Sequence, residues 1–337
     1  MSNSDEMQAF LTLEIDRVGE FIENSRKTLD AWLGSYILSY IMCEVARAVK
    51  KLPNAEVVYP ALEEQPLLEC LESGDRSDLD KLRISTFPDR LLAKIPLQAA
   101  KDCVNKATHA AEKAWQNVWQ GSRKQLEAVC RGLAREADWT SQCEGFFKIH
   151  WAVTPITDPD EARSYERHLE LMEAVNSSRR FSSIGQPGIK CSLCGNLSAL
   201  PWSGGDPKGL WEDVAQMKQF RRVFEKHERL SAVYAAKRLA GHGFVSPQIL
   251  KATDVGFPST ASLAAASVTA EAMENPDALA EFQKKLGGLR KVLDDHTAEA
   301  GIPRLLELAD KDEAKKWLAK LDGEWLLKDN YRIQRLC

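Results

Sequence analysis

The sequence predicts an α+β protein in which a ferredoxin-like domain is followed by an insert with two close cysteines and by a mainly helical domain. Three observations predict it. Residues 1–156 carry strand and helix patterns in the order strand, helix, strand, strand, helix, strand, which is that of the split βαβ unit. Residues 157–210 combine a helical pattern with a Gly-, Ser- and Pro-rich insert that holds two close cysteines, and residues 211–337 have mainly helical patterns.

Four short segments of the first domain have the patterns of β-strands. Residues 10–16 alternate apolar and polar side chains with period two, as a half-buried strand does. Residues 55–59, 90–95 and 146–153 are largely apolar and end close to prolines, which do not continue a strand. These segments predict a four-stranded sheet.

Two helical regions are expected between the strands. Apolar residues recur every four positions from Leu33 to Val49 and form one helical face. Residues 97–137 are rich in Ala, Lys, Gln and Glu and contain no Pro, which favours one or two long helices. The charged residues 69–83 indicate a loop or a frayed helix, and residues 241–259 indicate a loop within the last domain.

The composition limits the function classes. With 45 Lys and Arg against 49 Asp and Glu the net charge is −4, so the chain has no overall basic field for unspecific nucleic-acid binding. No signal peptide is recognised, and the apolar run 36–42 is far shorter than the roughly 18 residues of a membrane span. A cytoplasmic protein without membrane contact is expected. Four of its cysteines are expected to be buried thiols in a reducing compartment: Cys43, Cys70, Cys103 and Cys130.

Residues 24–39 contain the most informative motif of the chain. Two cations, Arg26 and Lys27, and the pair Gly34 and Ser35 come just before a long predicted helix. Free backbone N–H groups and the helix dipole favour an anion such as a phosphate at such a place. The alternative is that Gly34 and Ser35 only begin the helix and that the two cations are solvated.

Residues 24–39 also resemble the first palm domain of the large subunit of Cmr-type (type III-B) CRISPR effector complexes, whose motif runs close to R-K-T-x-D-x-W-x-G-S-Y-L-L-S. Further blocks match that family in the expected order: residues 55–60, 87–93, 190–195, 228–238 and 257–260. The resemblance therefore extends along the chain.

The resemblance implies a subunit of a type III CRISPR-Cas RNA-guided interference complex for antiviral defence, as the structural or assembly half of its large subunit. Its partners would be other Cmr-type subunits, and crRNA and target RNA through the complex. In that family a second palm holds divalent metal on a Gly-Gly-Asp-Asp hairpin and joins ATP into cyclic oligoadenylates. No complete catalytic motif is recognised here, because Gly204, Gly205 and Asp206 are followed by Pro207 and lack the second carboxylate.

A second interpretation makes the chain the obligate ATP-binding half of a two-chain cyclic oligoadenylate synthase. Arg26, Lys27, Gly34 and Ser35 would then line one side of a shared ATP pocket, as the resemblance implies. A separate chain with the second palm would supply the metal-binding carboxylates. A third interpretation, independent of the resemblance, is a stand-alone nucleotide-binding module.

Cys191 and Cys194 are the candidate metal ligands. A structural zinc site takes four N or S ligands, and the family's version uses four cysteines. The alternative is a knuckle-shaped turn without metal. Spacing selects none of the residues that could complete the ligand set: Cys143, His168, His227 and His242.

Three basic pairs have aromatic neighbours, an arrangement that would suit contact with an RNA backbone and stacking on its bases. Pairs of this kind are commonly solvated helix faces, and we expect that role here. The pairs are Arg179–Arg180, Arg221–Arg222 and Lys237–Arg238.

Overall fold

The computed structural model describes residues 7–157, 161–178, 186–201, 205–217, 220, 223–251, 260–281, 284, 305, 308–309 and 312–320. The chain divides into two compact units. The first comprises residues 1–24 and 32–253, and the second comprises residues 25–31 and 254–337. The domain boundaries predicted after residues 156 and 210 both fall inside the first unit.

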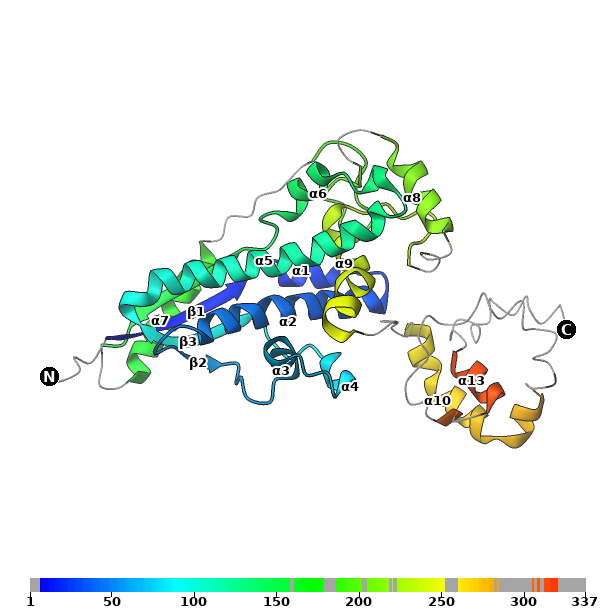
Figure 1. Ribbon diagram of the computed structural model, residues 1–337, viewed down its shortest axis with the longest axis horizontal. Helices are drawn as coiled ribbons and strands as arrows, with labels where there is room; N and C mark the ends of the chain where they lie inside the picture. Colours follow the sequence, from blue (N-terminus) through cyan, green and yellow to red (C-terminus); the bar gives the residue numbers. More distant parts are fainter. Residues whose placement is uncertain are drawn as a thin grey trace. The chain divides into compact units, whose positions relative to one another are not determined.

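A four-stranded antiparallel sheet forms part of the first unit (Figure 1). The spatial order of the strands is β2-β3-β1-β4, so the first strand of the chain is central. The α+β class is thereby confirmed, and three strands lie within two residues of their predicted positions. The strands are β1 (Gln8–Ile15), β2 (Glu56–Tyr59), β3 (Arg90–Pro96) and β4 (Ile149–Pro155).

The last strand begins later than its sequence predicts. Residues 146–153 were expected to form it, but β4 begins at Ile149. Phe147 instead packs its ring on Phe21 and Trp115, with ring centroids 4.9 and 5.1 Å apart. Burial in this aromatic cluster explains the apolar character that the sequence pattern assigned to the strand.

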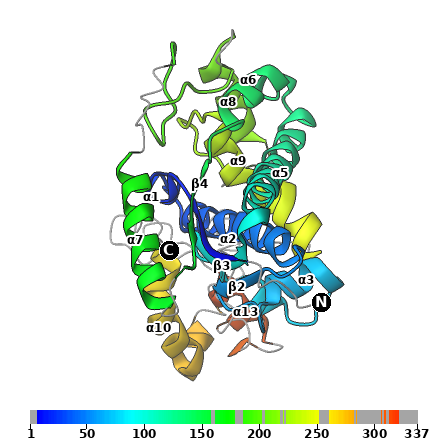
Figure 2. The ribbon, with the colours of Figure 1, turned by 90° about the vertical axis from the view of Figure 1, so that its left-hand side faces the viewer.

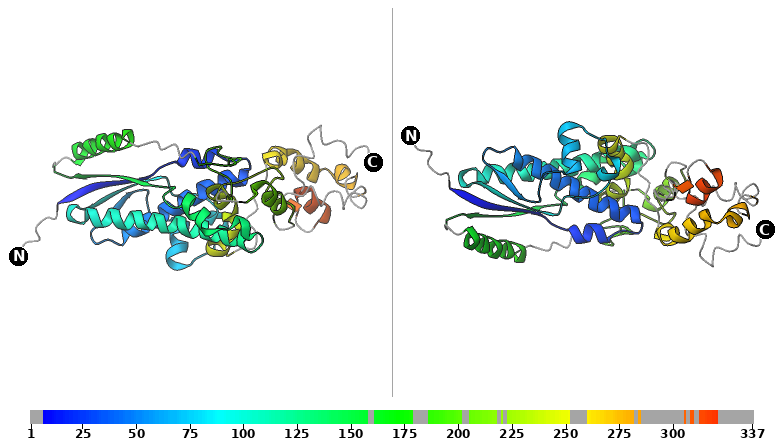
Figure 3. Two further views of the ribbon diagram at one scale, coloured as in Figure 1. Left: turned by 90° about the horizontal axis from the view of Figure 1, so that it is seen from above. Right: turned by 90° about the horizontal axis from the view of Figure 1, so that it is seen from below.

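Helices cover both faces of the sheet. Helices α2 (Thr28–Lys50) and α5 (Ala100–Glu127) lie on one face, and α7 (Glu161–Ser177) lies on the other (Figures 2 and 3). Every residue of β1 after Gln8 is therefore buried, although its side chains alternate between the two faces. The two long helices confirm the helical regions expected between the strands.

Helices occur both in the region expected as a loop or a frayed helix and in the region expected as a loop. Residues 69–83 lie largely in α3 (Pro66–Ser73) and α4 (Leu79–Leu82), and Gly74, with φ of 81°, ends α3. The expected loop at residues 241–259 is wrong for its first ten residues. They form the π-helix η3 (Gly241–Leu250), which packs against α5, whereas residues 252–259 lie outside the described residues.

Shorter helices complete the first unit around α5. Helix α9 packs on α5, where the Ser122 hydroxyl donates a hydrogen bond of 3.0 Å to the Ala236 carbonyl. The shorter helices are α1 (Val18–Glu23), α6 (Glu136–Cys143), α8 (Pro207–Gln216) and α9 (Ala232–Ala240), with 3₁₀ turns η1 (Leu97–Ala99) and η2 (Arg131–Leu133).

The described part of the second unit is helical beyond residue 254, as expected for this part of the last predicted domain. Helices α10 (Thr260–Glu274) and α13 (Glu313–Lys320) pack on each other. Their buried side chains are small or flexible, including Ala265, Met273 and Ala314. Across the described residues of both units, no helix combines the length and the apolar character needed to cross a membrane.

Candidate nucleotide and metal sites

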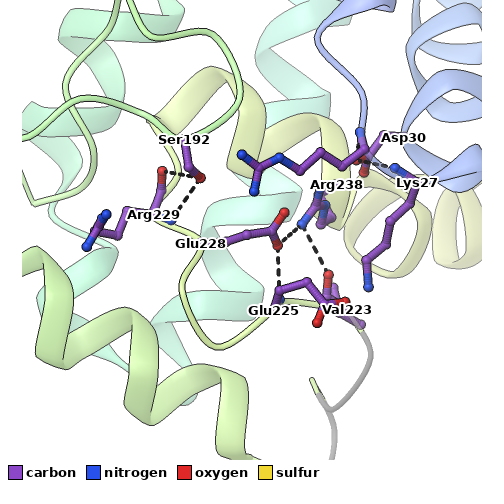
Figure 4. Close-up of polar contacts among 9 residues, drawn as sticks. Lys27, Asp30, Ser192, Val223, Glu225, Glu228, Arg229 and Arg238 are labelled. Carbon is purple, nitrogen blue, oxygen red and sulfur yellow. Dashed lines mark hydrogen bonds and ion pairs between the residues drawn. The ribbon is translucent and has the colours of Figure 1, made fainter. Parts of the chain in front are cut away.

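Helix α2 begins at Thr28, several residues before the start that the motif predicts. The buried Asp30 carboxylate accepts the backbone N–H groups of Arg26 at 3.2 Å and Lys27 at 3.3 Å (Figure 4). An acidic side chain at this end of the helix also matches the helix dipole. Asp30, within the first turn of α2, therefore supplies the carboxylate that binds the backbone just before the helix.

This start corrects the expected position of Gly34 and Ser35. They lie inside α2, where backbone N–H groups donate to carbonyls one turn earlier, and not at its open end. The anion-binding argument from free backbone N–H groups therefore does not apply to them. Arg26 is exposed and Lys27 is half-buried; both belong to the second unit, whereas Gly34 and Ser35 belong to the first.

The buried Gly34 lies beside the stem of a lysine from α9. A Cβ atom at position 34 would lie 3.5 Å from Lys237 Cδ and 3.6 Å from Ile22 Cα. Both are ordinary van der Waals distances. Gly34 of α2 and Lys237 of α9 therefore lie side by side, a contact that the sequence did not predict.

Lys237 is fully buried and binds the C-terminal end of α1. Its ammonium donates hydrogen bonds to the carbonyls of Phe21 at 2.6 Å and Asn24 at 2.8 Å. The rings of Phe21 and Tyr234 lie 5.1 and 5.3 Å from the charge. Carbonyl oxygens at a helix C-terminus and aromatic faces both stabilise a cation, which compensates for the loss of hydration.

Asn24 extends the same cluster. Its side-chain amide donates to the Tyr234 hydroxyl at 2.9 Å and to the Glu20 carbonyl at 2.8 Å. Burial raises the pKa of Tyr234 well above its usual value, so the phenol stays protonated at neutral pH. The end of α1 is therefore fixed by three side chains: Asn24, Tyr234 and Lys237.

Arg238 forms a buried ion pair. Its guanidinium contacts the Glu228 carboxylate and donates to the Val223 carbonyl at 3.3 Å, and the same carboxylate accepts the Glu225 N–H at 3.0 Å (Figure 4). Both charged side chains are essentially inaccessible to solvent. The expectation that this basic pair is solvated is therefore wrong.

The composition of α9 could have drawn attention to this burial. Seven of its nine residues are small, apolar or aromatic, and only Lys237 and Arg238 are charged. All nine of its residues are buried. The other two basic pairs, at residues 179–180 and 221–222, lie outside the described residues.

Cys191 and Cys194 lie in a tight turn that closes with a hydrogen bond of 3.0 Å from the Gly195 N–H to the Cys191 carbonyl. Gly195 has φ of 68°, a conformation that glycine adopts without strain. The turn is anchored on Arg229, whose carbonyl accepts the Ser192 N–H at 2.8 Å. The Ser192 hydroxyl accepts the Arg229 N–H at 3.0 Å (Figure 4). The cysteine turn thus packs against the residues that lead into α9.

The two cysteines act on each other electrostatically. A hydrogen bond from the Cys194 thiol lowers the pKa of Cys191 and raises that of Cys194. The pair therefore favours a single shared negative charge. Cys191 is buried and Cys194 is half-buried. Their two sulfur atoms have the donor chemistry for two of the four ligands of a zinc site.

The expected completing ligands are not gathered around this pair. Within the described part of the chain, no three His, Cys, Asp or Glu side chains form a group that could hold a metal ion. His168 lies on the sheet, where its ring nitrogens contact the hydroxyls of Thr12 at 2.7 Å and Thr154 at 2.9 Å. His227 and His242 are exposed, and Cys143 is buried. The described residues do not assemble a four-ligand site.

Comparison with known proteins finds a family match in the first third of the chain. Residues 10–120 match the family model described as the N-terminal part of the CRISPR-associated protein Cmr2. Over these residues the chain is similar to the N-terminal region of Cmr2. The Cmr subunit Cmr2 of the CRISPR system of Pyrococcus furiosus is 34% identical over 141 residues. That alignment covers 41% of this chain and 14% of the Cmr2 relative.

Two solved structures share the fold over nearly the whole chain. They are cryo-EM structures of type III-B Cmr-beta, one in the apo state and one bound to cognate target RNA. The TM-scores are 0.65 and 0.59 at 15% and 16% identity. Each match covers 99% of this chain and 43% of the other chain. The chain thus spans less than half the length of these Cmr-beta chains, and its Cmr2 region makes up the first third.

Proposed function

We propose that this chain is a structural subunit of a type III-B RNA-guided CRISPR interference complex, and that it acts as the N-terminal half of the large subunit. The observation that carries the proposal is the Cmr2 N-terminal match at residues 10–120, within a fold that follows the Cmr-beta chains over 99% of its length. Its partners are then other Cmr-type subunits, and it meets crRNA and target RNA through them.

The sheet supports a palm domain of the split βαβ kind. Helix α2 joins β1 to β2, but β3 lies between these two strands in the sheet. Helix α5 joins β3 to β4, and β1 lies between them. Each βαβ unit is therefore split by a strand of the other, which is the arrangement of the split βαβ, or ferredoxin-like, class.

Affinity purification from the native host tests this proposal. The tagged chain should bring down other Cmr-type subunits in mass spectra and crRNA in the extracted nucleic acid. A chain that purifies without either of them contradicts the assembly function. The interpretation as a stand-alone nucleotide-binding module would then gain support.

The exposed Arg26 and half-buried Lys27 motivate a second function, ATP binding in a two-chain cyclic oligoadenylate synthase. Cations next to a helix start suit phosphate oxygens, whereas the buried Gly34 is better explained by its contact with Lys237. Under this proposal a partner chain supplies the metal-binding carboxylates. Ser35, half-buried in α2, is the remaining candidate for a hydroxyl contact.

Synthesis of cyclic oligoadenylates by the reconstituted complex tests this second function. Arg26→Ala and Ser35→Ala should abolish synthesis, whereas Lys208→Ala, which changes an exposed lysine on α8, should not. Unchanged synthesis by both variants would exclude the ATP role of this chain.

A metal at Cys191 and Cys194 requires two further donors, which the described residues do not provide. We infer that any zinc bound there takes them from outside the described part of the chain or from a partner. Metal analysis of the purified complex, compared with the Cys191→Ser and Cys194→Ser variants, tests this inference. Equal zinc content in all three samples would refute it.

A further inference from the structure

Helix α7 covers only part of the sheet face on which it lies. It packs on β4 and β1, where the ring of Phe10 lies 5.5 Å from that of Tyr165 (Figure 2). The residues of β3 that share this face with Phe10 are exposed or half-buried, whereas those on the opposite face are buried. The first set is Arg90, Leu92 and Lys94, and the second is Leu91, Ala93 and Ile95. Strand β2 has no buried residue, so no described element covers this face of β3 and β2.

Two neighbouring cavities of about 440 and 370 Å³ lie between α7 and this open part of the sheet. They share Arg90, Leu169 and Met172 and therefore form one groove, which we call the α7–β3 groove. Tyr165 lines one of the cavities, and Glu173 lines the other. Each volume is in the range of cavities that hold a ligand or a large side chain. No function discussed above uses this groove.

Three large side chains of the groove are exposed on its two sides. Tyr59 of β2 is 50% exposed, and Tyr165 and Leu169 of α7 are 36% and 45% exposed. Tyrosine is enriched in protein interfaces, where it commonly contributes much of the binding free energy. Filling the groove would remove all three side chains from water.

The open part of the sheet has the width of one helix. Neighbouring strands lie about 4.8 Å apart, so two strands span roughly 10 Å, which is about the diameter of an α-helix. Helix α7 occupies the half of the face over β4 and β1. A second helix over β3 and β2 would lie at the usual packing distance of about 8–10 Å from α7 and would contact both α7 and the strands.

The charges of the groove favour a basic protein segment over RNA. The Arg90 guanidinium pairs with the Glu14 carboxylate at 3.0 Å. The carboxylates of Asp89 and Glu173 also line the groove, and no described cation lies within ion-pair distance of either. Carboxylates in this arrangement repel phosphate groups and attract lysine or arginine.

The helices of a second copy of this chain match these charges poorly. Helix α7 contains four glutamates and two arginines, and α10 contains two glutamates and no lysine or arginine. Either helix would bring further carboxylates toward Asp89 and Glu173. Like charges in contact oppose association, so a different protein fits the groove better.

We propose that an amphipathic helix of a partner protein lies beside α7 in the α7–β3 groove. Its apolar face covers Tyr59, Tyr165 and Leu169, and a lysine or arginine at the edge of that face pairs with Glu173. The partner helix thereby completes the helical layer over the half of the sheet that α7 leaves open.

Site-specific crosslinking in cells of the native host tests the proposal. A photoreactive phenylalanine at position 169 should crosslink to another protein. Mass spectrometry should map the crosslink to a peptide with apolar residues at helical spacing and at least one lysine or arginine. Crosslinks to RNA or to a second copy of this chain, crosslinks only within this chain, or none at all would overturn the proposal.

A synthetic peptide of the mapped segment then provides a quantitative test on the purified full chain. Leu169→Ala should weaken binding by roughly tenfold, because this side chain lines the groove. Leu171→Ala is the matched control, since Leu171 is 41% exposed on the same helix and does not line the groove. It should bind as the unchanged chain does, and thermal unfolding should show both variants folded. Equal affinity of the two variants would refute the site.

A charge exchange tests the basic character of the partner helix. Glu173→Lys should weaken binding of the peptide by about three- to tenfold. A peptide whose pairing lysine or arginine is replaced by glutamate should recover that loss with the Glu173→Lys chain. If no such replacement improves binding to this variant, the basic helix is the wrong occupant.

The inference does not depend on the proposed function, and the two fail separately. If the tagged chain co-purifies with Cmr-type subunits but position 169 yields no partner crosslink, the docking site is wrong and the complex membership stands. If the mapped peptide belongs to a protein outside such a complex and the tagged chain brings down no Cmr-type subunit, the docking site stands and the proposed function is wrong.

Discussion

Lys237 and Arg238 are adjacent in α9, are both buried, and use different oxygen atoms to remain charged. Lys237 donates hydrogen bonds to backbone carbonyls at the end of α1, whereas Arg238 forms an ion pair with the Glu228 carboxylate. A buried charge is tolerated only where such partners replace its hydration. Neither Lys237 nor Arg238 is therefore a surface contact for RNA. Substitution of either residue acts through the stability of the fold.

Lys237→Met should lower the free energy of unfolding by about 2–3 kcal/mol, because two hydrogen bonds from a charged donor are lost while the apolar stem is kept. Urea unfolding followed by circular dichroism measures the change. Lys208→Met, on the exposed surface of α8, should change stability by less than about 0.5 kcal/mol. A similar effect of both substitutions would contradict the capping role of Lys237.

His168 makes the attachment of α7 to the sheet dependent on pH. Burial lowers the pKa of its imidazole below the usual 6.5, so the folded state keeps the ring neutral. Its surroundings are the hydroxyls of Thr12 and Thr154 and the rings of Phe10 and Tyr165. The unfolded chain binds a proton below pH 6.5 that the folded chain does not.

The contribution of His168 to the free energy of unfolding should therefore be fully present above pH 6.5. It should decrease as the pH falls from there toward the pKa of His168 in the folded protein. His168→Gln, which does not titrate, should make this part of the stability profile flatter. Urea unfolding between pH 7.5 and pH 5.5 compares the two proteins. An identical slope for both would show that another group controls the acid side.

Helix α5 and the π-helix η3 touch backbone to backbone at two glycines. A Cβ atom on Gly121 would lie 2.4 Å from the Gly243 carbonyl oxygen, and one on Gly243 would lie 2.9 Å from the Gly121 carbonyl. Neither distance is compatible with a side chain, because the obstacle is backbone. The approach of these two elements therefore depends on the absence of two methyl groups.

Gly121→Ala should destabilise the protein by roughly 1–3 kcal/mol, since the two helices must separate to admit the methyl group. Gly34→Ala is the matched control in α2, where the added Cβ meets only ordinary van der Waals distances. It should be neutral or stabilising by up to about 1 kcal/mol, because alanine favours a helix over glycine. Thermal unfolding of both variants measures the difference, and equal melting temperatures would contradict this contact.

The cysteines of the described part of the chain are buried to different degrees. Cys43, Cys70 and Cys103 are buried as the sequence predicts, whereas Cys130 is half-buried because α5 ends at Glu127, before it. Burial raises the pKa of Cys103 to about 11 and raises that of Cys43 still further. These thiols remain protonated at neutral pH and do not act as nucleophiles.

Iodoacetamide treatment of the folded protein at pH 7.5 should therefore spare Cys43, Cys70 and Cys103. In the same reaction Cys130 should be alkylated first, because it is partly exposed, whereas Cys194 shares its thiol proton with Cys191. Peptide mass spectrometry measures the extent at each site, with alkylation in urea as the reference for full reaction. Early modification of Cys43 would show that the helix packing around it opens readily.

The strands and long helices of residues 8–155 could be predicted because their signals are local. The alternation in residues 10–16, the apolar face from Leu33 to Val49 and the Pro-free run from residue 97 each depend on neighbours within a few turns. The start of α2 was misplaced because a carboxylate at Asp30, and not the Gly-Ser pair, begins the helix. The fourth strand was shifted because tertiary burial of Phe146 and Phe147 has the same sequence pattern as a strand.

The sequence alone therefore determined the order of strands and helices, the short distance between the two cysteines and the likeness to Cmr-type large subunits. The tertiary structure alone decided which of these residues meet. Lys237 reaches the end of α1 across more than two hundred residues, and a cavity lined by Trp115, Trp119 and Phe147 forms only where α5 lies beside the residues that lead into β4. Local patterns fix backbone geometry over a few residues, whereas burial of a charge or the opening of a cavity depends on contacts between distant segments.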